Sequence, residues 1–223
     1  MLRNTKKILL ILISNLIVVF LIACSFTSQE TTLGSVRLSA PLDRAQLHKQ
    51  VYISEGFSSS EENNISDALK NWECITGGLI SFDIHFKYPQ DSTFILQDGI
   101  DKHTILLILP AKESNKHIID TDDYVKNHDN GRYVIGLYYE TDDVPTILLV
   151  NDRIGYWDYK PVVEHEVGHA LMLDHLKDRN SVMFPHIDES AKMITKVDLT
   201  ALCNIYWCSA EEMSKNIEKC ESK

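Results

Sequence analysis

The stretch that decides the fold covers residues 165–175 and reads His165-Glu166-Val167-Gly168-His169-Ala170-Leu171-Met172-Leu173-Asp174-His175. On a helix, residues four apart lie on one face, so His165 and His169 present two imidazoles about one turn apart. Two such imidazoles can hold one tetrahedral Zn²⁺, and Glu166 lies beside them as a candidate general base. His175 can add a third nitrogen ligand if the helix ends before it and the chain turns back, which leaves a fourth position open for water.

A competing interpretation of this stretch is a core helix that carries solvated histidines, because helix periodicity alone fits both. The combined spacing distinguishes the two interpretations. A third histidine follows the second by six residues, and Met183 follows the third by eight. Chance rarely produces that combination in a chain with nine histidines. We therefore predict a metal site in this stretch.

The flanking residues predict the helix that carries this site and the helix that follows it. We expect the first helix to run from Lys160 to Leu173, with Asp158 as its N-cap and Pro161 in its first turn. Its apolar face differs from its histidine face, so burial and metal binding do not compete. Thr195 and Asp198 have the spacing of a capping box and predict a final helix, and a short terminal helix is expected at 210–219.

The part of the chain before the motif contains apolar runs that are typical of strands. They lie at residues 50–53, 79–86, 104–109, 132–140 and 145–150. The third run is continuously apolar, as expected of a buried central strand. Ser59 and Glu62 have capping-box spacing and predict a helix whose apolar stripe ends at Gly77 and Gly78. This order of elements predicts one α/β domain over residues 50–223.

Residues 111–130 are polar and weakly patterned, which predicts a long surface loop. The acidic side chains of this segment are candidate calcium ligands, namely Asp120, Asp122, Asp123 and Asp129. Their spacing matches no calcium-binding loop, so Ca²⁺ is unsupported and a solvated loop is the better interpretation. An Asp-Asn-Gly turn is expected at 129–131.

The motif as a whole resembles the metzincin zinc peptidases. Ser181-Val182-Met183-Phe184-Pro185 is most similar to the Met-turn of their matrixin branch. The resemblance extends over residues 50–207, of which only 165–185 is specific. It implies a zincin catalytic domain of the α/β (α+β) class, with a mixed twisted sheet, an active-site helix, a Met-turn and a C-terminal helix.

The same resemblance implies a function and a set of roles. It implies a metalloendopeptidase that acts on a protein or peptide substrate. His165, His169 and His175 would bind one Zn²⁺, Glu166 would be the general base, and Met183 would lie beneath the metal. An edge strand at 133–139 would hold the peptide by strand addition, and residues 183–193 would form a wall of the substrate pocket.

One position departs from the family pattern. The family has Gly three residues after the second histidine, where the helix breaks in a left-handed conformation, and this chain has Met172 there. Such a conformation costs a residue other than Gly about 1–2 kcal/mol. Asp174 is therefore an alternative third ligand, ranked below His175.

Residues 1–23 have the pattern of a bacterial lipoprotein signal peptide. Arg3, Lys6 and Lys7 precede an apolar run that is shorter than the ~20 residues of a membrane-spanning helix. The run ends at Leu21-Ile22-Ala23-Cys24, which resembles a lipobox and implies a lipid on Cys24. That lipid would hold an exported protein at a membrane of the cell envelope, with residues 24–49 as a tether. An ordinary cleaved signal and an uncleaved anchor helix are the alternatives.

Charge and cysteine content limit the partners. The formal charge is −10, and it becomes −13 without residues 1–23, which contain three basic residues and no acidic ones. Such an acidic protein argues against binding to nucleic acid. The remaining cysteines, Cys74, Cys203, Cys208 and Cys220, suit two disulfides in any of three connectivities and lack the spacing of metal ligands. The oligomeric state is not predicted.

Two other functions are compatible with the sequence. One is a non-catalytic surface binding protein that contains zinc. A purely structural zinc site needs no base and usually has four protein ligands, so Glu166 argues against this function. The other is a zinc hydrolase that acts on a non-peptide amide. Only the Met-turn favours a peptidase over this function.

Overall fold

The computed structural model describes residues 47–88, 104–112, 114–128, 133–141, 144–155, 159–186 and 193–221. The expected signal peptide, Cys24, most of the expected tether, the turn at 129–131 and Asp158 lie outside these ranges. No helix within them is long and apolar enough to cross a membrane.

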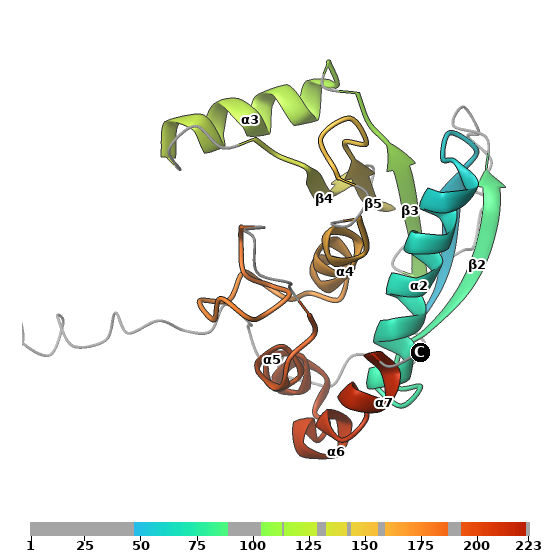
Figure 1. Cartoon of the computed structure of the whole chain (residues 1–223), viewed down its shortest axis with the longest axis vertical. Helices are drawn as coiled ribbons and strands as arrows, with labels where there is room; N and C mark the ends of the chain where they lie inside the picture. Colours follow the sequence, from blue (N-terminus) through green and yellow to red (C-terminus); the bar gives the residue numbers. More distant parts are fainter. Residues whose placement is uncertain are drawn as a thin grey trace, which may run out of the picture. The chain divides into compact units, whose positions relative to one another are not determined.

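Within the described residues, five strands form one sheet in the order β2-β1-β3-β5-β4 (Figure 1). The strands are β1 (His48–Ser54), β2 (Ser81–Tyr88), β3 (Ile105–Pro110), β4 (Gly136–Thr141) and β5 (Val144–Leu149). All neighbours are parallel except β4, which runs antiparallel to β5 at one edge. The mixed sheet and the central position of β3 are therefore confirmed. β1 begins two residues before the expected strand, so residues 48 and 49 belong to the sheet and not to the tether.

The first helix of the domain, α2 (Ser59–Ile75), begins one residue earlier than predicted. Its N-cap is Ser58, whose N–H donates to the Glu61 carboxylate at 2.7 Å while Glu61 N–H donates back to the Ser58 hydroxyl. Ser58 with Glu61 and Ser59 with Glu62 both have capping-box spacing. Ser59 and Glu62 were predicted to form the capping box. That prediction was wrong because local spacing alone does not choose between the two pairs.

Helix α2 packs against the motif helix α4 (Tyr159–Ala170) on one face of the sheet. Asn71 Nδ2 donates to Glu164 Oε1 at 2.7 Å, and Trp72 Nε1 donates to the Glu164 carbonyl at 3.0 Å. Glu164 immediately precedes His165, and all three partners are buried. These bonds therefore fix the rotation of α4 about its axis and the direction in which its histidines point.

Residues 111–130 do not form the predicted loop. They contain the helix α3 (Lys116–His128), which covers the opposite face of the sheet from α4 (Figure 1). Asn115 Oδ1 caps its first turn by accepting from His117 N–H at 2.9 Å. Ile118 is fully buried against Leu148 and Val150. The prediction was wrong because it took polar composition as evidence for a loop, whereas an amphipathic helix carries polar side chains on its exposed face and apolar ones such as Ile118 on the other.

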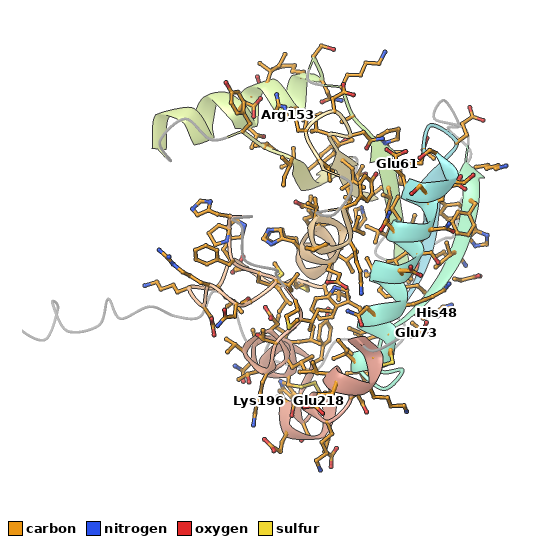
Figure 2. The ribbon with its side chains drawn as sticks, in the orientation of Figure 1. His48, Glu61, Glu73, Arg153, Lys196 and Glu218 are labelled. Carbon is orange, nitrogen blue, oxygen red and sulfur yellow. A yellow bond between two sulfur atoms is a disulfide. The ribbon has the colours of Figure 1, made fainter. Side chains whose placement is uncertain are left out.

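Asp122 has a structural partner that the sequence did not suggest. Its two carboxylate oxygens accept from Arg153 Nη1 at 3.0 Å and Nη2 at 2.8 Å, and Oδ1 also accepts from Val134 N–H at 2.9 Å. Figure 2 places Arg153 beside α3. The buried carboxylate forms a bidentate ion pair with the Arg153 guanidinium, so it ties α3 to the segment after β5. Asp122 is therefore no longer a candidate calcium ligand.

The C-terminal part contains α5 (Lys196–Tyr206), α6 (Ala210–Ser214) and α7 (Ile217–Glu221), so the expected single terminal helix is two short ones. Thr195 donates from its N–H and its hydroxyl to Asp198 Oδ2, both at 2.7 Å, at the predicted start of α5. The disulfide Cys74–Cys220 ties α7 to the end of α2, and Cys203–Cys208 closes the loop after α5. Only the tertiary structure selects this connectivity among the three.

Candidate metal centre

The three histidines of the motif come together around one point. His169 Nε2 lies 3.1 Å from His165 Nε2 and 3.3 Å from His175 Nε2. Nitrogens bound at 2.0–2.1 Å to a tetrahedral zinc ion lie about 3.3–3.4 Å apart, so this spacing fits Zn²⁺. Among the residues that the structure describes, these three side chains form a group whose ligand atoms all lie within 4.8 Å of one another.

The rings of His165 and His169 are held in the tautomer that a metal requires. His165 Nδ1 lies 2.7 Å from the Val182 carbonyl oxygen, and His169 Nδ1 lies 2.7 Å from the Leu173 carbonyl oxygen. A carbonyl only accepts, so each Nδ1 carries the proton and each Nε2 keeps a free lone pair. Burial and the nearby His169 lower the pKa of His165 to about 3 and that of His175 to about 4. Both rings are therefore neutral at pH 7.

The chain reverses after α4 through a left-handed turn. The predicted helix end at Leu173 is three residues too late, because α4 ends at Ala170. Leu173 N–H donates to the Gly168 carbonyl at 2.9 Å and Met172 N–H donates to the His169 carbonyl at 2.8 Å, which is the Schellman arrangement. Met172 has a φ of 66° and is 51% exposed, so little burial offsets a strain of about 1–2 kcal/mol.

This turn decides which residue reaches the other two histidines. It brings His175 into the group, whereas Asp174 is exposed and is not a member of it. A left-handed methionine at residue 172 therefore does not prevent His175 from joining the group.

We expect His175→Ala to lower zinc affinity by more than the ~100-fold that loss of a group supporting a ligand can cost. Asp174→Asn is the matched control, because it removes the neighbouring carboxylate and should leave zinc affinity within about threefold of the parent. Competition with a zinc indicator measures both affinities. Full zinc binding by His175→Ala together with a loss in Asp174→Asn would make Asp174 the third ligand.

Glu166 lies in a buried niche formed by the edge strand β4. Burial raises the pKa of its carboxyl to about 8, and a hydrogen bond from the Tyr138 backbone N–H opposes that rise. A Cβ added at Gly136 would lie 2.5 Å from Glu166 Oε1, so only glycine permits this approach of β4. Gly136 was not predicted as a site residue, and the single glycine of the predicted strand at 132–140 was the available signal.

The Met-turn packs directly beneath α4. A Cβ added at Gly168 would lie 2.2 Å from Met183 Sδ, which shows how closely the fully buried Met183 approaches the helix. Asp198 holds this turn from α5, because its Oδ1 accepts from the Ser181 hydroxyl and from Met183 N–H. Asp198 is completely buried. Its capping role was predicted, but its contact with the Met-turn was not, since nothing local links positions 15 residues apart.

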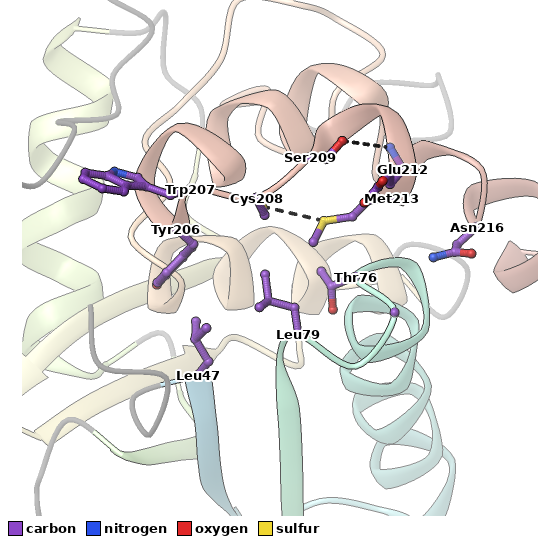
Figure 3. A pocket seen from close by; sticks show the side chains of 11 residues that line it. Leu47, Thr76, Leu79, Tyr206, Trp207, Cys208, Ser209, Glu212, Met213 and Asn216 are labelled. Atoms are coloured by element: carbon purple, nitrogen blue, oxygen red, sulfur yellow. Dashed lines mark hydrogen bonds between the residues drawn. The ribbon is translucent and has the colours of Figure 1, made fainter. Parts of the chain in front are cut away.

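The expected wall of the substrate pocket, residues 183–193, falls in part outside the described residues. Ser181 and Met193, which are described, form an isolated parallel bridge. A pocket of about 940 Å³ lies elsewhere, between the C-terminal helices and the end of α2, and its lining includes Leu47, Leu79, Tyr206 and Met213 (Figure 3). None of the three histidines lines that pocket. Its volume therefore carries no information about the metal centre.

Comparison with known proteins agrees with the fold. No curated protein matches the chain. The family model described as matrixin, Peptidase M10, matches residues 50–207. That range spans the sheet, the motif helix, the Met-turn and α5, so it covers most of the chain and every group of the candidate centre. The chain therefore belongs to the matrixin family of zinc metallopeptidases.

Proposed function

We propose that this protein is a zinc-dependent endopeptidase with His165, His169 and His175 as its metal ligands and Glu166 as its general base. The observation that carries the proposal is the convergence of three neutral imidazole Nε2 atoms, at 3.1 and 3.3 Å, next in sequence to a buried carboxylate. Three protein ligands leave a fourth position for substrate or water, which is typical of catalytic and not structural zinc.

The chain's own groups account for the proton transfers of peptide hydrolysis. Zinc bound at this site would supply Lewis acidity toward the scissile carbonyl and the attacking water. Glu166 accepts the proton of that water and passes it to the leaving nitrogen. Burial favours this role, because it raises the pKa of the carboxyl and so makes its carboxylate form a stronger base toward the proton of water. Gly136 and Tyr138 hold the carboxylate in place during both transfers.

The substrate chain would lie along β4. This strand is at the sheet edge, antiparallel to β5, and it contacts Glu166 through Gly136. An extended peptide can add to such an edge through main-chain hydrogen bonds. Strand addition would therefore bring a scissile bond close to the carboxylate, which favours cleavage within a chain and supports an endopeptidase.

We expect the full chain, purified in detergent, to cleave peptides of a mixed-sequence library at internal bonds. Treatment with a zinc chelator should abolish cleavage, and added Zn²⁺ should restore it, because all three protein ligands survive metal removal. Mass spectrometry of the products identifies the bonds cut. Stoichiometric zinc without cleavage of any peptide would favour a zinc-containing binding protein, and cleavage confined to non-peptide amides would favour the other hydrolase.

A second part of the proposal concerns location. We propose a lipid on Cys24 that anchors the protein at the bacterial cell envelope, on the basis of the basic residues and apolar run that precede Leu21-Ile22-Ala23-Cys24. Cys24→Ser should abolish incorporation of labelled fatty acid and shift the protein out of the membrane fraction. Ser25→Ala is the matched control and should keep both. Unchanged labelling of Cys24→Ser would refute the lipid anchor.

A further inference from the structure

A hydrogen bond links the turn that follows α4 to α5. The Tyr206 hydroxyl, at the end of α5, donates to the carbonyl oxygen of Leu171 at 3.2 Å across 35 residues of sequence. Leu171 is the last residue before the left-handed Met172, and its side chain is fully buried. Burial raises the pKa of Tyr206 to about 12, so the hydroxyl keeps its proton and can donate throughout the physiological range.

The peptide group that Tyr206 holds is the one that a change at Met172 would rotate. Moving Met172 from a φ of 66° to the ordinary helical region would turn the Leu171 carbonyl away from its present direction. Leu173, just beyond, supplies the carbonyl that accepts from His169 Nδ1 at 2.7 Å. The same turn leads to His175. Rotation at Met172 would therefore disturb the orientation of one ligand and the position of another.

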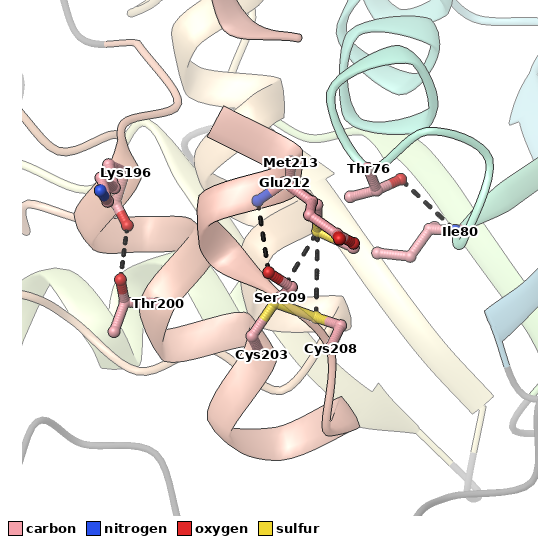
Figure 4. The surroundings of a disulfide bond; sticks show 9 residues. All are labelled: Thr76, Ile80, Lys196, Thr200, Cys203, Cys208, Ser209, Glu212 and Met213. Carbon is pink, nitrogen blue, oxygen red and sulfur yellow. Dashed lines mark hydrogen bonds between the residues drawn. A yellow bond between two sulfur atoms is a disulfide. The ribbon is translucent and has the colours of Figure 1, made fainter. Parts of the chain in front are cut away.

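Tyr206 is itself well fixed. The chain leaves α5 through Trp207, which is left-handed with a φ of 55°, and the disulfide Cys203–Cys208 closes this loop. Met213 Sδ lies 3.8 Å from Cys203 Sγ and 3.9 Å from Cys208 Sγ, so α6 packs on the bridge (Figure 4). The tyrosine ring also lines the pocket of Figure 3. A hydroxyl on such a rigid support can impose a direction on the carbonyl it binds.

We propose that Tyr206 is a positioning residue of the metal centre, which holds the Leu171 carbonyl so that the left-handed turn at Met172 keeps His169 and His175 directed at one metal ion. The proposal rests on the zinc site of the proposed function. Residue 172 is methionine and not glycine, so its left-handed conformation is disfavoured. The hydrogen bond from Tyr206, which comes from outside the turn, would help to maintain that conformation.

Zinc affinity of the full chain, measured by competition with a zinc indicator, tests this role directly. We expect Tyr206→Phe to weaken zinc binding about tenfold, the lower end of the range for groups that orient metal ligands. Tyr159→Phe is the matched control, since Tyr159 donates to Asn151 Oδ1 at the same distance of 3.2 Å from the opposite end of α4. It should leave zinc affinity unchanged, while thermal unfolding of the metal-free proteins shows what each lost hydroxyl does to stability.

A double variant separates positioning from general support. Adding Met172→Gly to Tyr206→Phe should restore most of the lost zinc affinity, because glycine adopts the left-handed turn without help. Unchanged affinity in Tyr206→Phe, an equal loss in Tyr159→Phe, or no restoration by Met172→Gly would each overturn the proposal. A parent chain that binds zinc but cleaves no peptide would overturn the endopeptidase function and leave this result intact.

Discussion

Replacement of Glu166 by glutamine should reduce peptide cleavage by at least ~10²-fold while zinc content stays near one ion per chain. Glutamine has the size of glutamate, so it fits the niche beside Gly136 and can still accept from the Tyr138 N–H. It lacks the basicity needed to take a proton from water. The loss should therefore appear in kcat/KM, and metal analysis of the same preparation should give the parent's zinc content.

Glu164→Gln provides the matched control for this experiment. It makes the same change two residues away on α4, where the side chain accepts from Asn71 at 2.7 Å, a bond that glutamine can keep. Its activity should stay within about tenfold of the parent, because neutral hydrogen bonds differ from charged ones by about 1 kcal/mol. Zinc loss in Glu166→Gln, or an equal loss of activity in both variants, would contradict the role of Glu166 as base.

Removal of the disulfide Cys74–Cys220 should cost a large amount of stability although the bridge lies outside the site. The bridge joins residues 146 apart in sequence, and chain entropy predicts a stabilisation of about 5 kcal/mol for such a loop. It also pins α7 to α2, the helix whose Asn71 and Trp72 fix α4. We expect the double variant Cys74→Ala, Cys220→Ala to lower the free energy of unfolding by about that amount in urea denaturation.

The second disulfide supplies the comparison. Cys203–Cys208 spans only 5 residues, for which the same relation gives about 2 kcal/mol. Cys203→Ala with Cys208→Ala should therefore lose less than half as much stability, although each double variant removes one buried and one partly buried cysteine. Equal losses, or a larger loss for the short bridge, would show that local packing on Met213 and not chain closure determines the effect.

The sequence by itself predicted the candidate metal ligands and the order of most elements. The spacing of His165, His169 and Met183 is a local property of one stretch, because a helix places residues four apart on one face in any context. The five strands and the start of α5 were predictable for the same reason, since period-two alternation and capping spacing act within a few residues. The shape of the turn at Met172 was left open by the sequence, because methionine disfavours the left-handed conformation that the family's glycine adopts.

Only the tertiary structure decided the features that depend on partners far apart in the chain. Helix α3 packs on the sheet through Ile118, and Asp122 binds Arg153, which lies 31 residues later, and the polar composition of the segment indicates neither contact. Whether Ser58 or Ser59 is the N-cap of α2 was likewise decided only in the folded structure. The folded structure also decided which of the three possible connectivities the four cysteines adopt, because separations of 146 and 5 residues give no local signal.

The supports of the metal centre belong to this second group. In the sequence, Gly136 looks like any other glycine. It matters because β4 passes so close to Glu166 that a Cβ at residue 136 would clash with the Glu166 side chain. Asp198 is visible as a capping residue, yet its other oxygen holds the Met-turn. Tyr206 becomes relevant only when α5 lies against the end of α4. Local sequence pattern supplies the groups that we propose to bind metal and react, whereas burial and long-range hydrogen bonds decide how firmly and in which direction they are held.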